Sequence, residues 1–446
     1  MSIYKDCDIR GVYGDDLDEA IAHGVGRAVG TLRPGALLVV GGDVRVSTPA
    51  LKAALIEGLR RSPVTVLDIG TVPTPAFYDA LTALGADGGV MVTASHNPAP
   101  YNGFKISLGA TPVTPGDIER IAELVRTKAF ADGTGAVREV PSLDGYRERM
   151  LALLAAPSPL RLVVDAGNGA AALVAPRLLR ELGHEVIELF CEIDGRFPNR
   201  SPNPAVAASL TALQRRTVDV GADLGIAFDG DGDRAVFVDA TGRIASAEEA
   251  MVVLARQLVR GPDDLVVYDL KSSSLVAEEI AALGGRSRME RSGHAFIRTA
   301  FLREGAVLAG EVSGHFFFRE LGHDDAIFAT ARMAEFLGRS GMSLSAQIAT
   351  MRHPVITPDL RIPWAMEERD ALLARIEGAF SDRPIMKIDG VRVEFDDGWL
   401  LARKSVTEPL VTLRIEAADH EGIAAIRSAL LAAVPELAGR QAFLTD

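Results

Sequence analysis

Short apolar runs alternate with amphipathic, helix-like segments along most of the chain. Three segments share one plan, in which an apolar run leads into a turn that contains Asp and then into a helical pattern; the runs start at Leu37, Leu162 and Leu265. Continuous Val/Leu strands that alternate with helices are typical of parallel sheets covered on both faces. The pattern therefore predicts three related α/β domains with parallel or mixed sheets.

A second apolar run in each of these segments ends in a polar loop. The three loops are Met91–Pro98, Asp229–Arg234 and Ala309–His315, and they follow their turn aspartates at comparable distances along the chain. In open α/β sheets, ligands bind beyond the carboxyl ends of the strands. We therefore expect the three loops to converge on one cleft.

The pattern changes after about Pro363. A helix over 366–380, short strands over 390–395, 399–403 and 410–416, and a helix over 422–434 predict a smaller α+β domain with an antiparallel sheet. A chain of 446 residues is also too long for a single core. We expect four domains around a central cleft, with boundaries at 1–145, 146–245, 246–360 and 361–446.

The composition of the chain restricts the kinds of molecule that it can bind. The chain has 47 Lys and Arg against 60 Asp and Glu, a formal charge of −13, which argues against nucleic acid and anionic membranes as partners. An anionic substrate would therefore need local basic groups. The start of the chain has no apolar run of signal-peptide type, and the only cysteines, Cys7 and Cys191, have no metal or redox spacing. These features predict a cytoplasmic protein.

The loop Asp229–Arg234 alternates three aspartates with two glycines. Carboxylates held ~4 Å apart repel each other by ~4 kcal/mol per pair at an effective dielectric constant of about 20, so a bound cation is expected. Oxygen ligands without a nearby Cys or His favour Mg²⁺ over Ca²⁺ or Mn²⁺. We predict one Mg²⁺ per chain on Asp229, Asp231 and Asp233. A solvated acidic turn is the alternative; an EF-hand is excluded by the apolar residues that follow Arg234.

Ser95 follows a predicted strand over 89–93 and precedes His96, and Pro98 prevents a helix from continuing there. A serine at a strand end is either a turn residue or a nucleophile, and a nucleophilic serine needs a base or a metal. The Gly-x-Ser-x-Gly elbow of lipases is missing. A phosphorylated Ser95 would give the cation a further oxygen ligand.

Two basic residues accompany that loop. Lys105 lies on the expected returning strand, where it can neutralise phosphate or, if burial lowers its pKa, act as a base. A solvated surface charge is the alternative. For Arg10, too, both a functional role and a solvated surface charge are open.

The third loop carries Glu311 and Ser313 two residues apart with glycines beside them, so both side chains can face one way and bind a sugar diol. A capped turn is the alternative. His294 and His315 are weak signals individually. In the C-terminal domain, the alternation of Arg403, Ser405 and Thr407 suits a bound phosphate or, alternatively, an edge strand.

Together the loops resemble those of the α-D-phosphohexomutase superfamily, most closely its phosphomannomutase/phosphoglucomutase branch. The resemblance covers nearly the whole chain, with the motifs in the family's order. Thr93–Pro98 is similar to the family's phosphoserine loop, Asp229–Arg234 to its metal loop, Gly310–His315 to its sugar loop, and Arg403–Pro409 to its phosphate-binding loop.

The resemblance implies a mechanism. Phosphorylated Ser95, also a ligand of the metal, would donate its phosphoryl group to a hexose monophosphate. The resulting hexose 1,6-bisphosphate would turn over in the cleft and return its other phosphate to Ser95. Lys105 would be the general base and Arg10 its electrostatic partner, with His96 beside the serine. The substrate would be bound by Arg234, Lys271, His294, Glu311, Ser313, His315, Arg403, Ser405 and Thr407.

Four positions depart from the family pattern, namely Cys7 for Tyr, Gly42 for Arg, Val312 for Met or Gln, and Val406 for a small or amide residue. They leave open whether mannose, glucose or glucosamine phosphate is preferred. A phosphoglucosamine mutase is the nearest alternative; a serine-dependent phosphatase and a non-catalytic sugar-phosphate-binding protein are others. We expect a monomer or weak dimer.

Overall fold

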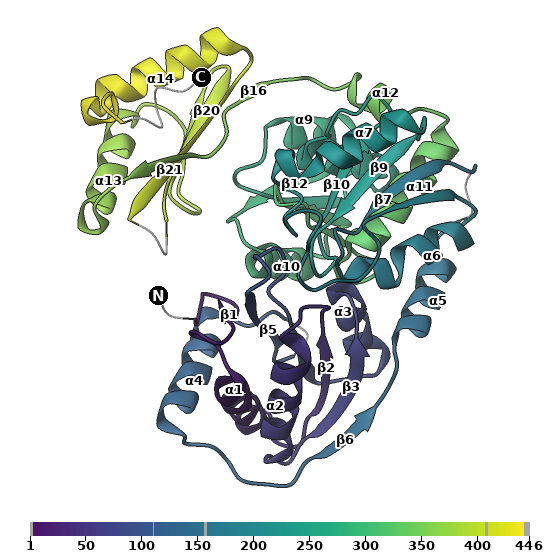
Figure 1. The fold of residues 1–446 in the computed structure, drawn as a ribbon. Coiled ribbons are helices and arrows are strands. Elements are labelled where there is room, and N and C mark those ends of the chain that lie inside the picture. The colour runs from purple at the N-terminus through teal and green to yellow at the C-terminus, as the bar shows by residue number, and fades with distance from the viewer. Residues whose placement is uncertain (1–2, 110, 156–157, 406–408, 441–446) are drawn as a thin grey trace.

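The computed structural model describes residues 3–109, 111–155, 158–405 and 409–440. They form four sheets in chain order (Figure 1), three of them mixed and the last one antiparallel. The predicted fold class is thereby confirmed. Within these ranges, no helix combines the length and apolar character needed to cross a membrane.

The first sheet has the strand order β1-β5-β4-β2-β3-β6. Its inner strands run parallel, whereas β5 runs antiparallel to both of its neighbours. The strands are β1 (Ile9–Val12), β2 (Leu37–Gly42), β3 (Thr65–Thr71), β4 (Gly88–Val92), β5 (Tyr101–Ser107) and β6 (Ala136–Glu139). The helices are α1 (Glu19–Leu32), α2 (Thr48–Arg60), α3 (Thr74–Ala83) and α4 (Pro115–Thr127).

The second and third sheets have the orders β10-β9-β7-β8 and β12-β11-β13-β14-β15. The second is made of β7 (Arg161–Asp165), β8 (Glu185–Leu189), β9 (Leu224–Phe228) and β10 (Ala235–Asp239), with helices η1 (Ala170–Leu173), α6 (Ala175–Glu181), η2 (Ala207–Leu210) and α7 (Thr211–Asp219). The third is made of β11 (Leu265–Asp269), β12 (Arg286–Glu290), β13 (Leu308–Gly310), β14 (Phe316–Phe318) and β15 (His323–Asp324), with helices α8 (Ala247–Leu258), α9 (Leu275–Ala282), α10 (His294–Glu304), α11 (Ala326–Ser340) and α12 (Leu344–Ile348).

The repeat predicted from the sequence recurs in the three sheets. In each, a strand that runs parallel to the first strand of the repeat (β4, β9 or β13) ends in a functional loop, and the chain returns on an antiparallel strand. The three loops therefore leave equivalent ends of their sheets. They also touch, because the Ser95 hydroxyl donates to Asp229 Oδ2 at 2.8 Å, and Arg234 forms an antiparallel bridge with His315.

The C-terminal part is a separate α+β unit, drawn from green to yellow in Figure 1. Its strands are β16 (Val355–Ile356), β17 (Leu360–Pro363), β18 (Ile385–Met386), β19 (Val391–Phe395), β20 (Gly398–Lys404) and β21 (Leu410–Ala417). Its helices are η3 (Met366–Glu368), α13 (Arg369–Ala379), α14 (His420–Ala433) and η4 (Pro435–Leu437). The predicted ranges agree closely with η3 and α13, β19, β20, β21 and α14, whereas β16, β17, β18 and η4 were not predicted.

Packing separates the C-terminal unit from the rest. One continuous apolar core extends through the first three sheets, whereas the C-terminal sheet has its own. A small cluster of Leu270, Trp399 and Leu401 joins this unit to the third sheet. The C-terminal unit is thus attached by a far smaller apolar contact than the one that unites the other three.

Two expected domain boundaries fall inside elements. Residue 145 lies within α5 (Leu143–Leu153), and residue 360 is the first residue of β17. Helix α5 bonds to the first and third units, since Arg149 Nε is 2.8 Å from Asp79 Oδ1 in α3 and Tyr146 donates at 2.7 Å to Asp325 Oδ2, just before α11. The four domain ranges stay a prediction.

Candidate active site

Ser95 lies just beyond β4 in the left-handed backbone region, with φ of 49°. Few residues other than glycine adopt this conformation, and such strain is concentrated at functional sites. The amide of Ser95 donates to Thr93 Oγ1 at 2.9 Å, and its hydroxyl donates to Asp229 Oδ2 at 2.8 Å. The serine is fully buried. The fold thus holds the predicted nucleophile directly against the predicted metal loop.

Arg45, which the sequence analysis missed, fixes the backbone of this loop. Its guanidinium is fully buried and pairs with Asp43 at 3.1 Å. It also donates to four carbonyl oxygens at 2.7–3.0 Å, those of Ser95, Asn97, Pro98 and Tyr101. One side chain therefore holds both ends of the serine loop. The Asp-x-Arg pattern after β2 is the signal that sequence reasoning could have used.

The metal loop turns around the carboxylate of Asp229. Its Oδ1 accepts hydrogen bonds from the amides of Gly232 at 2.9 Å, Asp233 at 3.1 Å and Arg234 at 3.2 Å. Gly232 has φ of 79°, which a side chain would disfavour, so the glycine makes this tight turn possible. The apolar strand β9 and its antiparallel partner β10 carry the loop.

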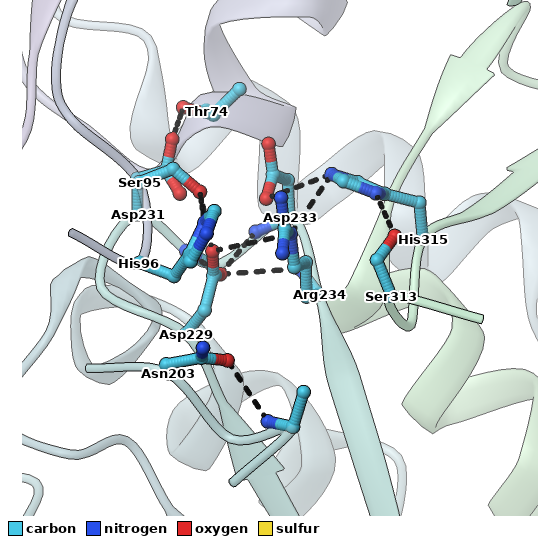
Figure 2. A network of polar contacts seen from close by, with 12 residues as sticks. Thr74, Ser95, His96, Asn203, Asp229, Asp231, Asp233, Arg234, Ser313 and His315 are labelled. Carbon is cyan, nitrogen blue, oxygen red and sulfur yellow. Dashed lines mark hydrogen bonds and ion pairs between the residues drawn. The ribbon is translucent and has the colours of Figure 1, made fainter. Parts of the chain in front are cut away.

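The three aspartates are fully buried and each offers an oxygen within 4.8 Å of the others. Asp231 Oδ2 accepts from Thr74 Oγ1 at 2.6 Å and from Lys105 Nζ at 2.7 Å, and Lys105 also bonds to Asp233. Among the described residues, the Oδ1 atoms of Asp231 and Asp233 have no hydrogen-bond partner, although Asp233 Oδ1 lies 3.4 Å from Nε2 of His315. Buried carboxylate oxygens without partners are costly, so this donor set fits a hard divalent cation. Figure 2 shows the aspartates gathered beside Ser95.

The pKa shifts in the cluster also favour a bound cation. Burial, followed by the charges of Asp233 and Asp231, raises the pKa of Asp229 well above its usual value. A bound cation would relieve that repulsion. Burial also lowers the pKa of Lys105, but Asp231 and Asp233 outweigh it and raise this pKa well above its usual value. The lowered pKa on which the prediction of a general base depends is therefore not seen here.

Arg10 and His96 flank the serine loop. Arg10 donates to Asn97 Oδ1 at 2.7 Å and pairs with Asp8 at 2.7 Å. His96 Nδ1 lies 3.3 Å from Ser95 Oγ. Burial, then the cations Arg234 and Arg10, lower the pKa of His96 to about 2, so the imidazole is neutral.

The sugar loop forms one bonded cluster around His315. Its Nδ1 lies 2.7 Å from Glu311 Oε2 and 3.0 Å from Ser313 Oγ, and the Ser313 hydroxyl donates to Glu311 Oε2 at 3.1 Å. Burial and Arg234 lower the pKa of His315, but Asp233 and Glu311 outweigh them and raise it to about 9. The side chains of Glu311 and Ser313 thus bond to each other beside His315, and their binding of a sugar diol stays a prediction.

A cleft of about 340 Å³ lies beside these groups and draws on all four sheets. The predicted residues that line it are Arg10, Lys105, Arg234, His294, His315 and Arg403. Unpredicted Arg291, Arg298 and Tyr78 line it as well. The cleft is therefore basic in a chain of net charge −13, as an anionic substrate requires.

Several predicted residues lie outside this lining. Ser95 and the three aspartates are fully buried; Asp231 and Asp233 pair with the lining residue Lys105, and Asp233 also lies near His315. Ser313 faces a neighbouring pocket. Lys271 pairs with Asp359 instead of lining the cleft, and Thr407 and Val406 are outside the described residues. Ser405, on the chain beyond β20, accepts a bond from Arg369 through its carbonyl.

Among the departures from the family pattern, Cys7 lines the cleft. Gly42 ends β2 and a Cβ there would lie 2.5 Å from Thr48 Cγ2, so a larger residue needs a different local packing. Val312 faces the pocket next to Ser313.

Three mixed α/β sheets thus place their strand-end loops around a buried serine and a carboxylate cluster, beside a basic cleft suited to an anionic substrate. Comparison of the sequence with models of known protein families finds one family along most of the chain. Profiles of phosphoglucomutase/phosphomannomutase α/β/α domains I, II and III and of the C-terminal domain match residues 1–132, 144–242, 246–353 and 362–433. The chain belongs to the phosphoglucomutase/phosphomannomutase family.

Individual relatives support this assignment over the full length. A phosphomannomutase/phosphoglucomutase of Pseudomonas putida is 38% identical over 448 residues, covering 98% of this chain and 97% of the relative. A phosphoglucomutase of Neisseria gonorrhoeae is 37% identical, covering 97% and 96%. The crystal structure of a phosphoglucomutase/phosphomannomutase family protein from Burkholderia thailandensis matches with a TM-score of 0.90 at 37% identity, covering 97% and 98%. The expected enzyme class is thus confirmed.

Proposed function

We propose that this enzyme reversibly interconverts hexose 1-phosphate and hexose 6-phosphate, with mannose or glucose or both as the sugar, through phosphorylated Ser95 and a hexose 1,6-bisphosphate. One observation carries the proposal most directly. Ser95 Oγ is held 2.8 Å from Asp229, in a strained backbone conformation beside buried carboxylates and a basic cleft.

The carboxylate cluster and the serine would share one metal. Asp229, Asp231, Asp233 and phosphorylated Ser95 would hold Mg²⁺, which neutralises charge on a transferring phosphoryl group. Phosphoryl transfer depends chiefly on positioning and charge stabilisation, and Arg10, Lys105 and Arg234 line the adjacent cleft.

The two half-reactions are the reverse of each other. In the first, a sugar hydroxyl oxygen bonds to phosphorus, the bond between phosphorus and Ser95 Oγ breaks, and the hydroxyl proton is taken up by the protein. After the bisphosphate turns over, Ser95 Oγ receives the other phosphate and the sugar oxygen regains a proton, so no phosphate is released. We assign the proton exchange to Lys105, the cleft lysine in contact with the aspartates, because a cation bound to these aspartates would offset the charges that raise the pKa of Lys105.

Recognition is assigned to the groups around and beyond the cleft. Arg10 would steady the serine loop through Asn97. Glu311 and Ser313 would bind sugar hydroxyls, and His294 and His315 would line the substrate. The non-reacting phosphate would be bound by Arg403, Ser405, Thr407 and Lys271, which requires Lys271 to leave Asp359.

We also propose a cytoplasmic monomer or weak dimer. The lining of the cleft supports a monomer, because it already includes residues from all four sheets of one chain. A second copy is not needed to complete it. The two widely separated cysteines fit a reducing compartment. Sedimentation at several protein concentrations tests the oligomeric state.

A coupled assay tests the proposed reaction. With Mg²⁺ and a trace of glucose 1,6-bisphosphate, mannose 1-phosphate, glucose 1-phosphate and glucosamine 1-phosphate are compared while free phosphate is monitored. We expect isomerisation of mannose or glucose phosphate without phosphate release. Preferred turnover of glucosamine phosphate would reassign the substrate, and phosphate release or no turnover would refute the mutase reaction.

A further inference from the structure

Two histidines line the cleft, and they are held differently. Both ring nitrogens of His315 are engaged, Nδ1 by Glu311 at 2.7 Å and Nε2 near Asp233 at 3.4 Å, and its side chain is only 3% exposed. The side chain of His294 is 24% exposed, and its Nε2 lies 2.7 Å from Asp324 Oδ1. Within the described chain, no hydrogen bond is made by Nδ1 of His294. His294 therefore has one nitrogen available for a ligand.

Asp324 determines which nitrogen that is. It lies on the short strand β15, opposite Phe317 of β14, and its side chain is fully buried. Its second oxygen, Oδ2, has no hydrogen-bond partner among the described residues. Burial raises the pKa of Asp324, but His294 and His315 outweigh this effect and bring it to about 2. The carboxylate is thus an obligate acceptor, and it requires a proton on Nε2 of His294.

Packing prevents the ring from turning away. The Tyr78 ring stacks on His294 with an interplanar angle of 14° and a centroid distance of 6.0 Å. His315 meets it edge-on at 5.2 Å, and Phe317 lies at 5.3 Å. His294 is also the first residue of α10, so its backbone is fixed by the helix. Orientation and tautomer are therefore both set by residues other than the proposed metal ligands, although one of them, His315, contacts Asp233.

We propose that Asp324 is a positioning residue of the mutase reaction. By accepting a hydrogen bond from Nε2–H of His294, it leaves Nδ1 of that ring as an acceptor toward the cleft, where Nδ1 accepts a hydrogen bond from a hydroxyl group of the sugar phosphate. The inference rests on the proposed function. Groups that orient an active imidazole in this way typically contribute 10- to 100-fold to activity or affinity in metal sites, and we expect a similar effect here.

The first test is Asp324→Asn, which keeps the shape and removes the obligate acceptor. We expect kcat/KM for the preferred hexose phosphate to fall about 10- to 100-fold. Asp325→Asn is the matched control. This neighbouring aspartate is equally buried, but it bonds to Tyr146 and to the amide of Phe328 at the start of α11, so it affects folding and not the cleft. We expect it to lower the melting temperature with kcat/KM nearly unchanged.

A double-mutant cycle separates positioning from general damage. If Asp324 acts through His294, adding Asp324→Asn to His294→Gln should cost little beyond the single His294→Gln variant. Full additivity of the two losses would overturn the proposal. So would an Asp324→Asn enzyme with wild-type kcat/KM.

A spectroscopic measurement tests the same point without turnover. In the full chain labelled with ¹⁵N-histidine, the His294 signal, identified by its loss in His294→Gln, should show protonation at Nε2. Asp324→Asn should shift the population toward protonation at Nδ1. An unchanged tautomer would overturn the proposal even if activity falls. If no hexose phosphate is turned over by the wild-type enzyme, the proposed function fails while this readout still decides the role of Asp324.

Discussion

The serine and metal loops differ from the phosphate-binding side in how their polar groups are held. Ser95, Asp229 and Arg45 are fully buried and bonded to groups from several elements, including backbone amides and carbonyls. Arg403 and Lys271 instead form single ion pairs with Asp389 and Asp359, and all four side chains are partly exposed. The reacting groups are therefore organised in advance, whereas the recognition groups must exchange an internal carboxylate for the ligand's phosphate.

For Arg403 this contrast matches the packing, whereas Lys271 follows β11 in the third sheet. The two reactive loops belong to the part of the molecule that shares one continuous core, while Arg403 belongs to the unit with a core of its own. Changes on the reactive side should therefore reduce kcat, and changes on the recognition side should act on KM. The predictions below test that division.

The largest effect is expected for Ser95→Ala. Removal of the nucleophile should lower mutase kcat by about 1,000-fold or more, while glucose 6-phosphate still binds in calorimetry. Ser62→Ala is the control, because Ser62 is also fully buried but lies just beyond α2, outside the cleft lining. An unimpaired Ser95→Ala enzyme would sink the proposed mechanism.

Asp231→Asn should come next. It removes a charge from the proposed metal cluster and the partner of Lys105 and Thr74, so we expect roughly 100-fold lower kcat and at least about 10-fold weaker Mg²⁺ binding. Activity and calorimetry over a range of Mg²⁺ concentrations measure both. Asp239→Asn, at the far end of β10, should keep the wild-type Mg²⁺ dependence. Equal Mg²⁺ dependence in the two variants would contradict the assignment of the metal site.

Arg45→Lys tests whether the serine loop is organised in advance. A lysine cannot reproduce the planar set of bonds to four carbonyls, so kcat should fall about 10- to 100-fold and the free energy of unfolding by about 2 kcal/mol. Arg27→Lys is a matched control, since Arg27 is buried and binds the carbonyls of Arg61 and Ala131 away from the cleft. It should lose stability but keep kcat; equal losses of kcat in both would refute a specific role for Arg45.

Sequence reasoning located the loops because their signals are local. An apolar run, a turn aspartate and a polar loop are contiguous features, and Ser95, Asp229 and Glu311 each follow such a run at a strand end. Likewise, the alternation of strand and helix patterns was enough to predict the four sheets.

The missed features depend on contacts between distant segments. Arg45 meets the serine loop about 50 residues later, and His294 meets Asp324 across 30 residues. The ion pairs that raise the pKa of Lys105 come from aspartates 126 and 128 residues away. No local pattern encodes these pairings, so the choice between a base and a cation at Lys105 could not be made from the sequence.

On the recognition side, Arg403→Lys should raise KM for hexose phosphates about 10-fold with kcat within a few-fold of wild type. Lysine keeps the charge but loses the paired donors with which a guanidinium binds phosphate. Steady-state kinetics with mannose and glucose phosphates measure the split. A fall in kcat with unchanged KM would place Arg403 with the reactive groups and break the division.

Asp389→Asn should have the smallest effect and the opposite sign. Asp389 can either orient Arg403 or compete with phosphate for it, and asparagine distinguishes the two because it keeps a hydrogen-bond acceptor while removing the charge. Ion pairs this exposed contribute at most about 1 kcal/mol, so loss of the competitor should lower KM by no more than about 5-fold, with kcat unchanged. Asp370→Asn, which removes the partner of neighbouring, exposed Lys404, should leave KM unchanged. A raised KM for Asp389→Asn would mean that the carboxylate orients Arg403, and the recognition side would then be organised in advance as well.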